Sequence, residues 1–404
     1  MRLSCVAMIA LCGAALFSAD EDPNSVANYL KGQAAAPFFV APPKTIPMTG
    51  VPNAAPGEST VGASLVKERS EQPGIVSTKL AIQSGDDAPV RGVVWSRDLK
   101  SIYLLQGNGE LRKINVDTLT LEAFVQLGRT DGSGLSLSKE GLLLSLKEVQ
   151  DIWILDEQTL ATVRKIAVPE VLVAWSAPSL SFAFAVHGPE NNPKDSIKVI
   201  DLKSKKVVKE YKWEQIAATA PTKHNPIAHV SGFEMGCLEV NRTGEWLIVP
   251  EGHGIIRLKI DGPNLTLVEQ GKGETHSFPC FTLSSDGKFI LSRQAIPNTG
   301  YSQNALYSIL NLQTPSVLLP QVLGSNAYVR TYDSVSMQYI GESSGMQLVA
   351  LDKAGKIARA YTISTKNDLT HQIYAHPLGN RYLVHTGNAF FWVQNQSDRK
   401  VAPK

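Results

Sequence analysis

The chain has 404 residues, of which 43% are apolar and 19% charged, and its formal net charge at pH 7 is +2. This length and composition support a large core of the kind that a barrel or a repeat array forms. The nearly neutral charge, with no basic run that contains interleaved aromatics, argues against a nucleic-acid-binding surface.

The first residues have the pattern of an export signal. Arg2 precedes an apolar stretch over residues 3–11, and small residues continue through Ala19 until acidic residues begin at Asp20. The stretch is shorter than the ~20 residues that span a bilayer. We therefore expect residues 1–19 to be a signal peptide and the chain to be exported to the periplasm, the cell envelope or the medium. The position of cleavage and the presence of a lipid anchor stay open.

Residues 20–73 are rich in Pro and Ala and show no hydrophobic periodicity. Such segments bury too little apolar surface to offset the entropy of ordering them. We therefore expect a disordered linker over 20–73, and a short basic tail over 399–404 at the other end of the chain.

A loose repeat occurs seven times between residues 74 and 398. Each unit has an alternating apolar run, an anchor residue, a turn, a second apolar run and a third run that ends in Asp or Asn. The anchors are Ser96, Ser138, Ser176, Asn241, Ser284, Asp333 and His376. Four short antiparallel strands in every ~40–45 residues are typical of a propeller blade. We predict an all-β fold, a seven-bladed β-propeller with four-stranded antiparallel blades.

The repeats also resemble a known group of proteins. The turn over 284–288 (SSDGK) and the run over 200–208 (IDLKSKKVV) are similar to the repeats of YVTN-type and Trp–Asp-repeat-like propellers of secreted bacterial proteins. The YVTN tetrapeptide and the Trp–Asp pair themselves do not occur. The resemblance implies the propeller fold. It implies no single function, because such propellers include binding modules, lactonases and quinone- or metal-dependent oxidoreductases.

The last unit ends after three strands, at Asn395, whereas the apolar run over 75–82 precedes the first unit and belongs to none. We expect this N-terminal strand to complete the last blade, because a ring closed in this way leaves fewer exposed sheet edges.

Alternate positions before each anchor differ in size. Trp95, Leu135 and Trp175 lie one or three residues before an anchor, whereas Gly92 and Gly134 lie four residues before one. A face of large side chains against a face of small ones predicts interdigitation between neighbouring blades, with the tryptophans in packing roles.

Cys237 and Cys280 are the two cysteines outside the expected signal, and each lies four residues before an anchor. Because the same register in consecutive blades points both side chains in the same rotational sense, we predict two free, buried thiols and no disulfide.

Insertions are concentrated in units three to five. The hairpins over 187–195 and 293–304 and the link over 212–232 are long, and 251–254 forms a hairpin tip. In a four-stranded blade these hairpins and links open on one face, and longer loops often carry function. The expected binding residues are His187, Asn191, Asn192, Asp195, His224, His229, Glu251, His253, Arg293, Tyr301 and Gln303.

Motifs for catalysis are missing from the sequence. There is no nucleophile elbow, no phosphate-binding glycine loop and no Cys-x-x-Cys pair, so we predict no catalytic or metal-binding residue and leave the cofactor undetermined. We expect an exported binding or scaffold module whose partner is a protein, peptide or glycan, with no nucleic acid and no transmembrane segment in the mature chain.

A propeller enzyme with its site on the same face is the alternative. Its local support is Glu239, on an innermost strand, together with Glu251 and His253. A buried acid in the channel could act as a base, although a water-exposed carboxylate is the commoner state of such a position.

Overall fold

A computed structural model describes part of the chain, and the structural statements below refer to that part. The described residues are 44–47, 60–72, 75–83, 88–128, 134–146, 149–187, 196–212, 239–251, 254–272, 282–283, 287, 289–295, 302–312, 317–318, 330–332, 335–342, 345–351, 357–364, 370–377, 381–386 and 389–395. The expected signal peptide, both mature-chain cysteines and the basic tail lie outside them. Among them, no helix is long and apolar enough to span a bilayer.

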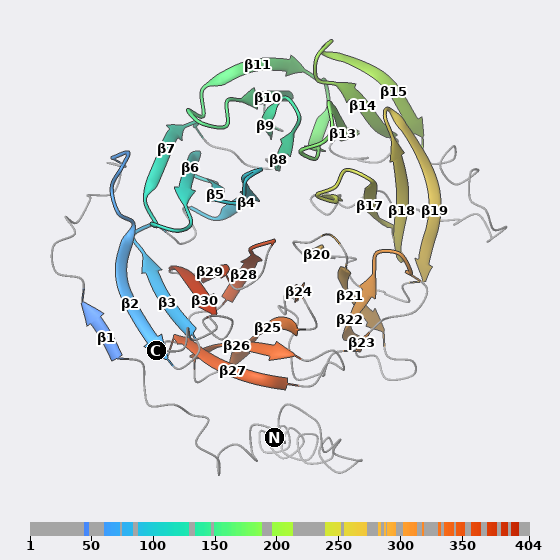
Figure 1. The fold of residues 1–404 in the computed structure, drawn as a ribbon. Coiled ribbons are helices and arrows are strands. Elements are labelled where there is room, and N and C mark those ends of the chain that lie inside the picture. The colour runs from blue at the N-terminus through green and yellow to red at the C-terminus, as the bar shows by residue number, and fades with distance from the viewer. Residues whose placement is uncertain are drawn as a thin grey trace, which may run out of the picture.

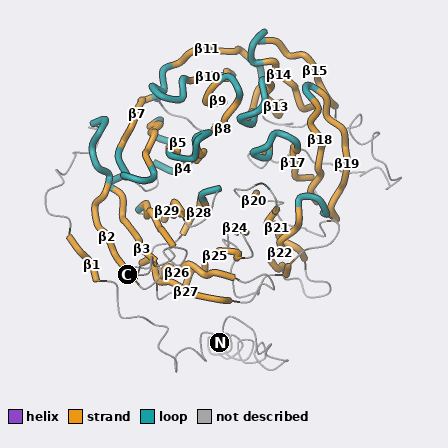
Figure 2. The backbone as a smooth tube through the Cα atoms, in the orientation of Figure 1, coloured by secondary structure: helices purple, strands orange, loops and turns teal. Residues whose placement is uncertain are grey.

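The described strands form seven antiparallel sheets arranged around a ring (Figure 1). Figure 2 shows that strands and connecting loops make up these parts of the chain. The expectation of an all-β propeller built from four-stranded antiparallel sheets is confirmed.

Six sheets have four strands each, and we number them in chain order. From the centre outward, the first sheet contains β4 (Val90–Trp95), β5 (Ser101–Gln106), β6 (Glu110–Asn115) and β7 (Leu121–Gln126). The second contains β8 (Gly134–Ser138), β9 (Gly141–Leu146), β10 (Asp151–Leu155) and β11 (Thr162–Ala167). The third contains β12 (Val171–Trp175), β13 (Phe182–His187), β14 (Ser196–Asp201) and β15 (Lys206–Lys212).

The fourth to sixth sheets repeat this order. The fourth sheet contains β16 (Glu239–Val240), β17 (Trp246–Glu251), β18 (Gly254–Asp261) and β19 (Asn264–Lys272). The fifth contains β20 (Thr282–Leu283), β21 (Phe289–Ala295), β22 (Ser302–Ser308) and β23 (Val317–Leu318). The sixth contains β24 (Arg330–Tyr332), β25 (Val335–Glu342), β26 (Gly345–Leu351) and β27 (Ile357–Ser364).

The seventh sheet joins the two ends of the chain. Its strands are β28 (Thr370–Ala375), β29 (Arg381–Thr386), β30 (Phe390–Asn395), β3 (Ile75–Leu80), β2 (Val66–Gln72) and β1 (Lys44–Pro47), in that order.

Anchor residues close the turn between the first two strands of a sheet. The Ser138 hydroxyl donates to the carbonyl oxygen of Gly141 at 2.9 Å. Asn241 Oδ1 accepts hydrogen bonds from the N–H groups of Glu245 and Trp246, at 3.0 and 2.9 Å. Ser138 and Asn241 are buried. The anchor recurs because a short polar side chain satisfies backbone groups that the turn removes from water.

Small residues in the innermost strands let neighbouring sheets approach closely. A Cβ atom on Gly92 would lie 2.7 Å from Leu135 Cβ, and one on Gly134 would lie 2.7 Å from Val173 Cγ2. Leu135 and Val173 are buried members of the next sheet's core. The expected packing of large residues against small ones between neighbouring sheets is therefore found at these two interfaces.

The substitution Gly134→Ala tests this packing. The added methyl group would meet Val173 and the Ser145 hydroxyl at less than van der Waals distance, so we expect the free energy of unfolding to fall by about 1–3 kcal/mol. Urea unfolding measures it, and Thr162→Ala, at an exposed position of the same sheet, is the matched control. Equal stability of the two variants would contradict the close approach.

The N-terminal strand closes the ring as the sequence predicts. β3 pairs antiparallel with β30, so that Ile75 lies opposite Asn395 and Leu80 opposite Phe390. Ile75 and Leu80 are almost fully buried. The fourth place of the last sheet is thus filled by a segment that precedes the whole array in sequence.

The predicted linker over 20–73 needs correction at its C-terminal end. β2 pairs with β3 on the outside of the last sheet, and β1 pairs with β2. Just before β2, the Gly62 N–H donates to the carbonyl of Leu121 at 2.7 Å, and the Leu121 N–H donates to the carbonyl of Ala63 at 3.0 Å. Because Leu121 begins β7, residues 60–72 form a clasp that joins the first sheet to the last.

Removal of residues 1–83 tests the closure. We expect the free energy of unfolding to fall by more than about 4 kcal/mol, because Ile75, Val76 and Leu80 are buried and each contributes roughly 1.5–3 kcal/mol. A chain that lacks only residues 1–59 keeps the clasp and β3, and it should unfold at the parent's urea concentration. A 1–83 deletion that unfolds like the parent would disprove the role of β3.

Candidate functional site

Three neighbouring sheets direct one hairpin each to the same face of the ring. β13, β17 and β21 are the second strands of the third, fourth and fifth sheets, and they end at His187, Glu251 and Ala295. Because equivalent strands of successive sheets run in the same direction, these three ends open on one face, which we call the hairpin face.

The longest connections between a second and a third strand are those of the third and fifth sheets. Residues 188–195 join β13 to β14, and residues 296–301 join β21 to β22, whereas 107–109 and 343–344 suffice for the same hairpin in the first and sixth sheets. The link over 213–238 leaves β15 at Lys212, which pairs with Ser196 at the start of β14. The strand boundaries therefore show the same clustering of long segments that the sequence spacing indicates.

Four of the eleven expected binding residues lie on described strands. His187 pairs with Ser196 at the mouth of its hairpin, and Glu251 pairs with Gly254. Arg293 and Gln303 face Asn304 and Gln294, respectively, across the hairpin of β21 and β22. The other seven lie outside the described residues: Asn191, Asn192, Asp195, His224, His229, His253 and Tyr301. The backbone thus places these four residues at or near the strand ends on the hairpin face. The binding role of all eleven residues stays a prediction.

Glu239 lies on β16, the innermost strand of the fourth sheet, where the sequence favours a water-exposed carboxylate. Part of the residue's surface remains accessible. The carboxyl group itself is enclosed, and this burial raises the pKa of Glu239 to about 7, partly opposed by a hydrogen bond from the Leu283 backbone on β20. The carboxyl group therefore points toward the fifth sheet rather than into open water, and it changes charge near neutral pH.

Glu239 gives the protein a pH-dependent stability. Its pKa is higher in the folded chain than its ordinary value of 4.5, so the folded state holds the proton more tightly and the free energy of unfolding falls as the pH rises from about 4.5 to about 7. Glu239→Gln removes this loss, and we expect it to gain up to about 3 kcal/mol over the parent between pH 5 and pH 8 in urea unfolding.

Glu245→Gln is the control for that measurement, because Glu245 is an exposed carboxylate of the same sheet. A stability difference between Glu239→Gln and the parent that does not change with pH would contradict the buried position of the carboxyl group.

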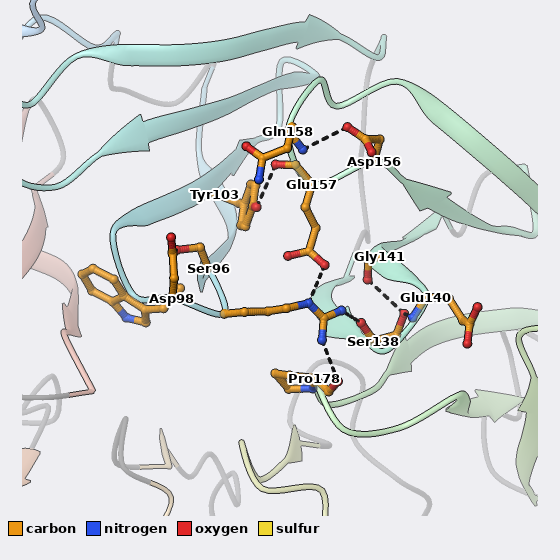
Figure 3. Close-up of polar contacts among 12 residues, drawn as sticks. Ser96, Asp98, Tyr103, Ser138, Glu140, Gly141, Asp156, Glu157, Gln158 and Pro178 are labelled. Atoms are coloured by element: carbon orange, nitrogen blue, oxygen red, sulfur yellow. Dashed lines mark hydrogen bonds and ion pairs between the residues drawn. The ribbon is translucent and has the colours of Figure 1, made fainter.

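On the opposite face, the turns between first and second strands are tied to one another. Arg97, which follows the first anchor, donates from Nε to Glu157 Oε1 at 2.7 Å and from Nη1 to the carbonyl of Pro178 at 2.7 Å. Its second terminal nitrogen donates to the carbonyl of Ser138. Figure 3 shows these partners converging from the second and third sheets. One arginine thus links three consecutive sheets.

A second arginine reaches from the fourth sheet to the first. Arg242 Nη2 donates to the carbonyls of Ser96 and Arg97 at 2.8 and 3.4 Å, and Nη1 donates to that of Trp95 at 3.4 Å. Burial, with the nearby Arg97 charge, lowers the pKa of the Arg242 guanidinium. Both arginines donate to acceptors of other sheets, so they hold the turns of this face together.

The sequence contains a signal for this pair of arginines. Arg97 and Arg242 each stand directly after an anchor residue, Ser96 and Asn241. An arginine at this point lies in the innermost turn of its sheet, where carbonyl groups of other sheets are within reach. Only the folded ring shows which sheets those are.

In the first sheet, the polar side chains at the mouth of the equivalent hairpin are bonded to one another and to the backbone. Arg112 and Glu110 form an ion pair at 2.6 Å, and both side chains are buried. Asn108 donates to Glu110 Oε2 at 2.8 Å, and the Gln106 amide donates to the carbonyl of Gln83 at 2.8 Å. These polar groups satisfy one another and fix the chain that leads from β3 to β4.

Metal ligands do not cluster in the described part of the chain. Within it, no group of three or more His, Cys, Asp or Glu side chains is close enough to hold a metal ion.

Comparison with known proteins shows the fold. No model of a known protein family matches the chain, and no curated protein matches its sequence. The β-propeller domain of Cps50 (Swd1) from Myceliophteria thermophila is similar, with 12% identity and a TM-score of 0.51 over 77% of this chain and 97% of that chain. U3-55K is similar at 12% identity and a TM-score of 0.53, over 80% and 99% of the two chains.

The WD40 domain of Pan2 from Neurospora crassa shares 11% identity, with a TM-score of 0.51 over 78% of this chain and 95% of that chain. These similarities identify the β-propeller fold. At such identities they do not identify a function, which depends on the residues of each surface.

Proposed function

We propose that the chain is an exported propeller that works as a binding or scaffold module, and that its hairpin face binds a protein, peptide or glycan. One observation carries the proposal: the strands that flank the long connections 188–195, 213–238 and 296–301 have their adjoining ends on one face of three neighbouring sheets. Loops longer than a hairpin requires are uncommon in a compact array and often functional. A rigid ring that holds variable loops is a favourable scaffold for recognition, because little loop entropy is lost on binding.

The central turns on the opposite face support the same choice. Arg97 and Arg242 have their donors engaged with carbonyl and carboxylate groups of other sheets. A ligand at that place would have to replace these contacts, each of which contributes about 0.5–1.5 kcal/mol net.

A triple substitution on the hairpin face tests the proposal. Asn191→Ala, Tyr301→Ala and His253→Ala together should weaken a partner cross-linked from the cell envelope at least tenfold, because each removes a polar or aromatic contact group. The midpoint of urea unfolding should not change.

The matched control changes exposed residues at turns of the opposite face, Lys100→Ala, Thr118→Ala and Lys139→Ala. It should keep the partner at full affinity. Loss of the partner in the control alone, or in neither variant, would show that the hairpin face is the wrong one.

A propeller enzyme is the second candidate, and Glu239 is the observation that favours it. A carboxyl group with a pKa of about 7 can accept or deliver a proton near neutral pH. Protein purified from its native host would then carry a metal or an organic cofactor, or would lose turnover of its substrate on Glu239→Gln. Elemental analysis and an absorbance spectrum distinguish this candidate from the binding module.

A further inference from the structure

The outer rim of the second and third sheets carries a surface that neither proposed function uses. It consists of β11 and of residues 203–212, which include β15; we call it the rim surface. The outermost strands β7, β11 and β19 of the first, second and fourth sheets each bury some of their side chains, such as Leu265 and Leu267 of β19. β15 has no buried residue.

Apolar side chains are exposed on the rim surface. Val163 is 61% exposed, Val207 47% and Val208 45%, and these are three of the six large apolar side chains that are exposed in the described chain. Isolated exposed valines need no explanation, but Val207 and Val208 are consecutive on β15 and together expose apolar area that water solvates poorly.

The rim surface is also strongly basic. Cationic and acidic residues are nearly balanced in the whole chain, at 39 and 37. On the rim surface seven cationic residues face one acidic residue, Glu210. The cationic residues are Arg164, Lys165, Lys203, Lys205, Lys206, Lys209 and Lys212.

The acidic groups next to these lysines are already engaged. Asp201 accepts hydrogen bonds from the N–H groups of Lys203 and Ser204, at 2.8 and 3.3 Å, in the turn that precedes β15. Glu210 accepts a hydrogen bond from the Ser196 hydroxyl at 2.5 Å. Lys203 also forms an ion pair with Glu140 at 3.7 Å. Seven cationic groups against Asp201, Glu210 and Glu140 leave the rim surface with a net positive charge.

The two parts of the rim surface are connected by a hydrogen bond. Arg164 on β11 donates a hydrogen bond to the carbonyl of Leu202, in the turn between β14 and β15. Figure 1 shows β11 and β15 following one another along the outside of the ring. A single extended ligand can therefore touch both strands.

We propose that the rim surface binds an acidic, extended polypeptide segment that also carries apolar side chains. Carboxylates of such a segment would pair with Lys205, Lys206 and their neighbours, and its apolar side chains would cover Val207 and Val208. β15 is the last strand of its sheet, so its outer edge can also pair with a peptide backbone. A lipid surface or a nucleic acid has no backbone that pairs with a strand, which is why a polypeptide fits better.

Lysines on an edge strand have another known use, which is to prevent two sheets from pairing edge to edge. The bulge at Val208, where the register with β14 shifts, has the same effect. Both features would exist without any partner. Charge reversal separates the two explanations, because glutamates protect an edge as well as lysines do but repel an acidic ligand.

The test measures binding of a fluorescein-labelled peptide of alternating glutamate and valine residues to the full chain, by fluorescence anisotropy. The peptide should bind the parent, and added salt should weaken it. The variant Lys205→Glu/Lys206→Glu should bind at least tenfold more weakly. The matched control Lys100→Glu/Lys139→Glu reverses the same charge at exposed turns away from the rim and should bind within about twofold of the parent.

A second variant tests the apolar part of the surface. Val207→Thr/Val208→Thr keeps the β-branched shape that suits a strand and removes exposed apolar area, so it should weaken the peptide a few-fold without a change in the urea midpoint. Equal weakening of rim and control charge reversals would overturn the proposal. Tighter binding of phosphatidylserine vesicles or of duplex DNA than of the peptide would also overturn it.

Discussion

Contact between neighbouring sheets is the constraint on which the structure depends. Each sheet is too small to bury its own faces, so its side chains must fit those of the next sheet around a closed ring. At Gly92 and Gly134 the fit leaves no room for a Cβ atom. The anchor side chains help to meet this constraint. They form hydrogen bonds within their own innermost turns, where there is little space for other groups.

Closure of the ring follows from the same constraint, because a ring of sheets is stable only when the last one is complete. The chain achieves this with β3, from its N-terminal side, and strengthens it with the clasp over 60–72, which bonds to the first sheet at Leu121 and to the last sheet through β2. Arg97 and Arg242 add bonds between sheets on one face. Rigidity at the centre and at the seam leaves the hairpins of the other face free to vary in length.

Much of this architecture could be predicted from sequence, because it rests on local patterns. The anchors mark tight turns, the alternation of large and small residues marks sheet contacts, and the unpaired run over 75–82 predicts the closing strand. The clasp was missed because VKERSEQ (66–72) is polar, and composition alone favours a linker. Its pairing depends on β3 and on buried Leu65, which only the closed ring brings together.

The state of Glu239 was missed for a similar reason. Its burial depends on the fifth sheet, whose Leu283 backbone lies far along the sequence, and no local pattern around residue 239 reports that contact. Arg242 likewise finds its partners in the first sheet. Contacts between equivalent positions of neighbouring sheets could be inferred from the spacing of the repeats. The contact of Arg242 across the ring and the burial of the Glu239 carboxyl group could not.

The hairpin face and the rim surface meet at one point of the chain. β15 carries the exposed lysines and valines, and it ends at Lys212, opposite Ser196 and next to the mouth of the β13–β14 hairpin. The longest link of the array, over 213–238, starts there. An acidic segment held on the rim would thus lie beside the loops that we assign to binding. Because complementary charge accelerates encounter more than it strengthens the final complex, such a rim would recruit a partner that the hairpin face then selects.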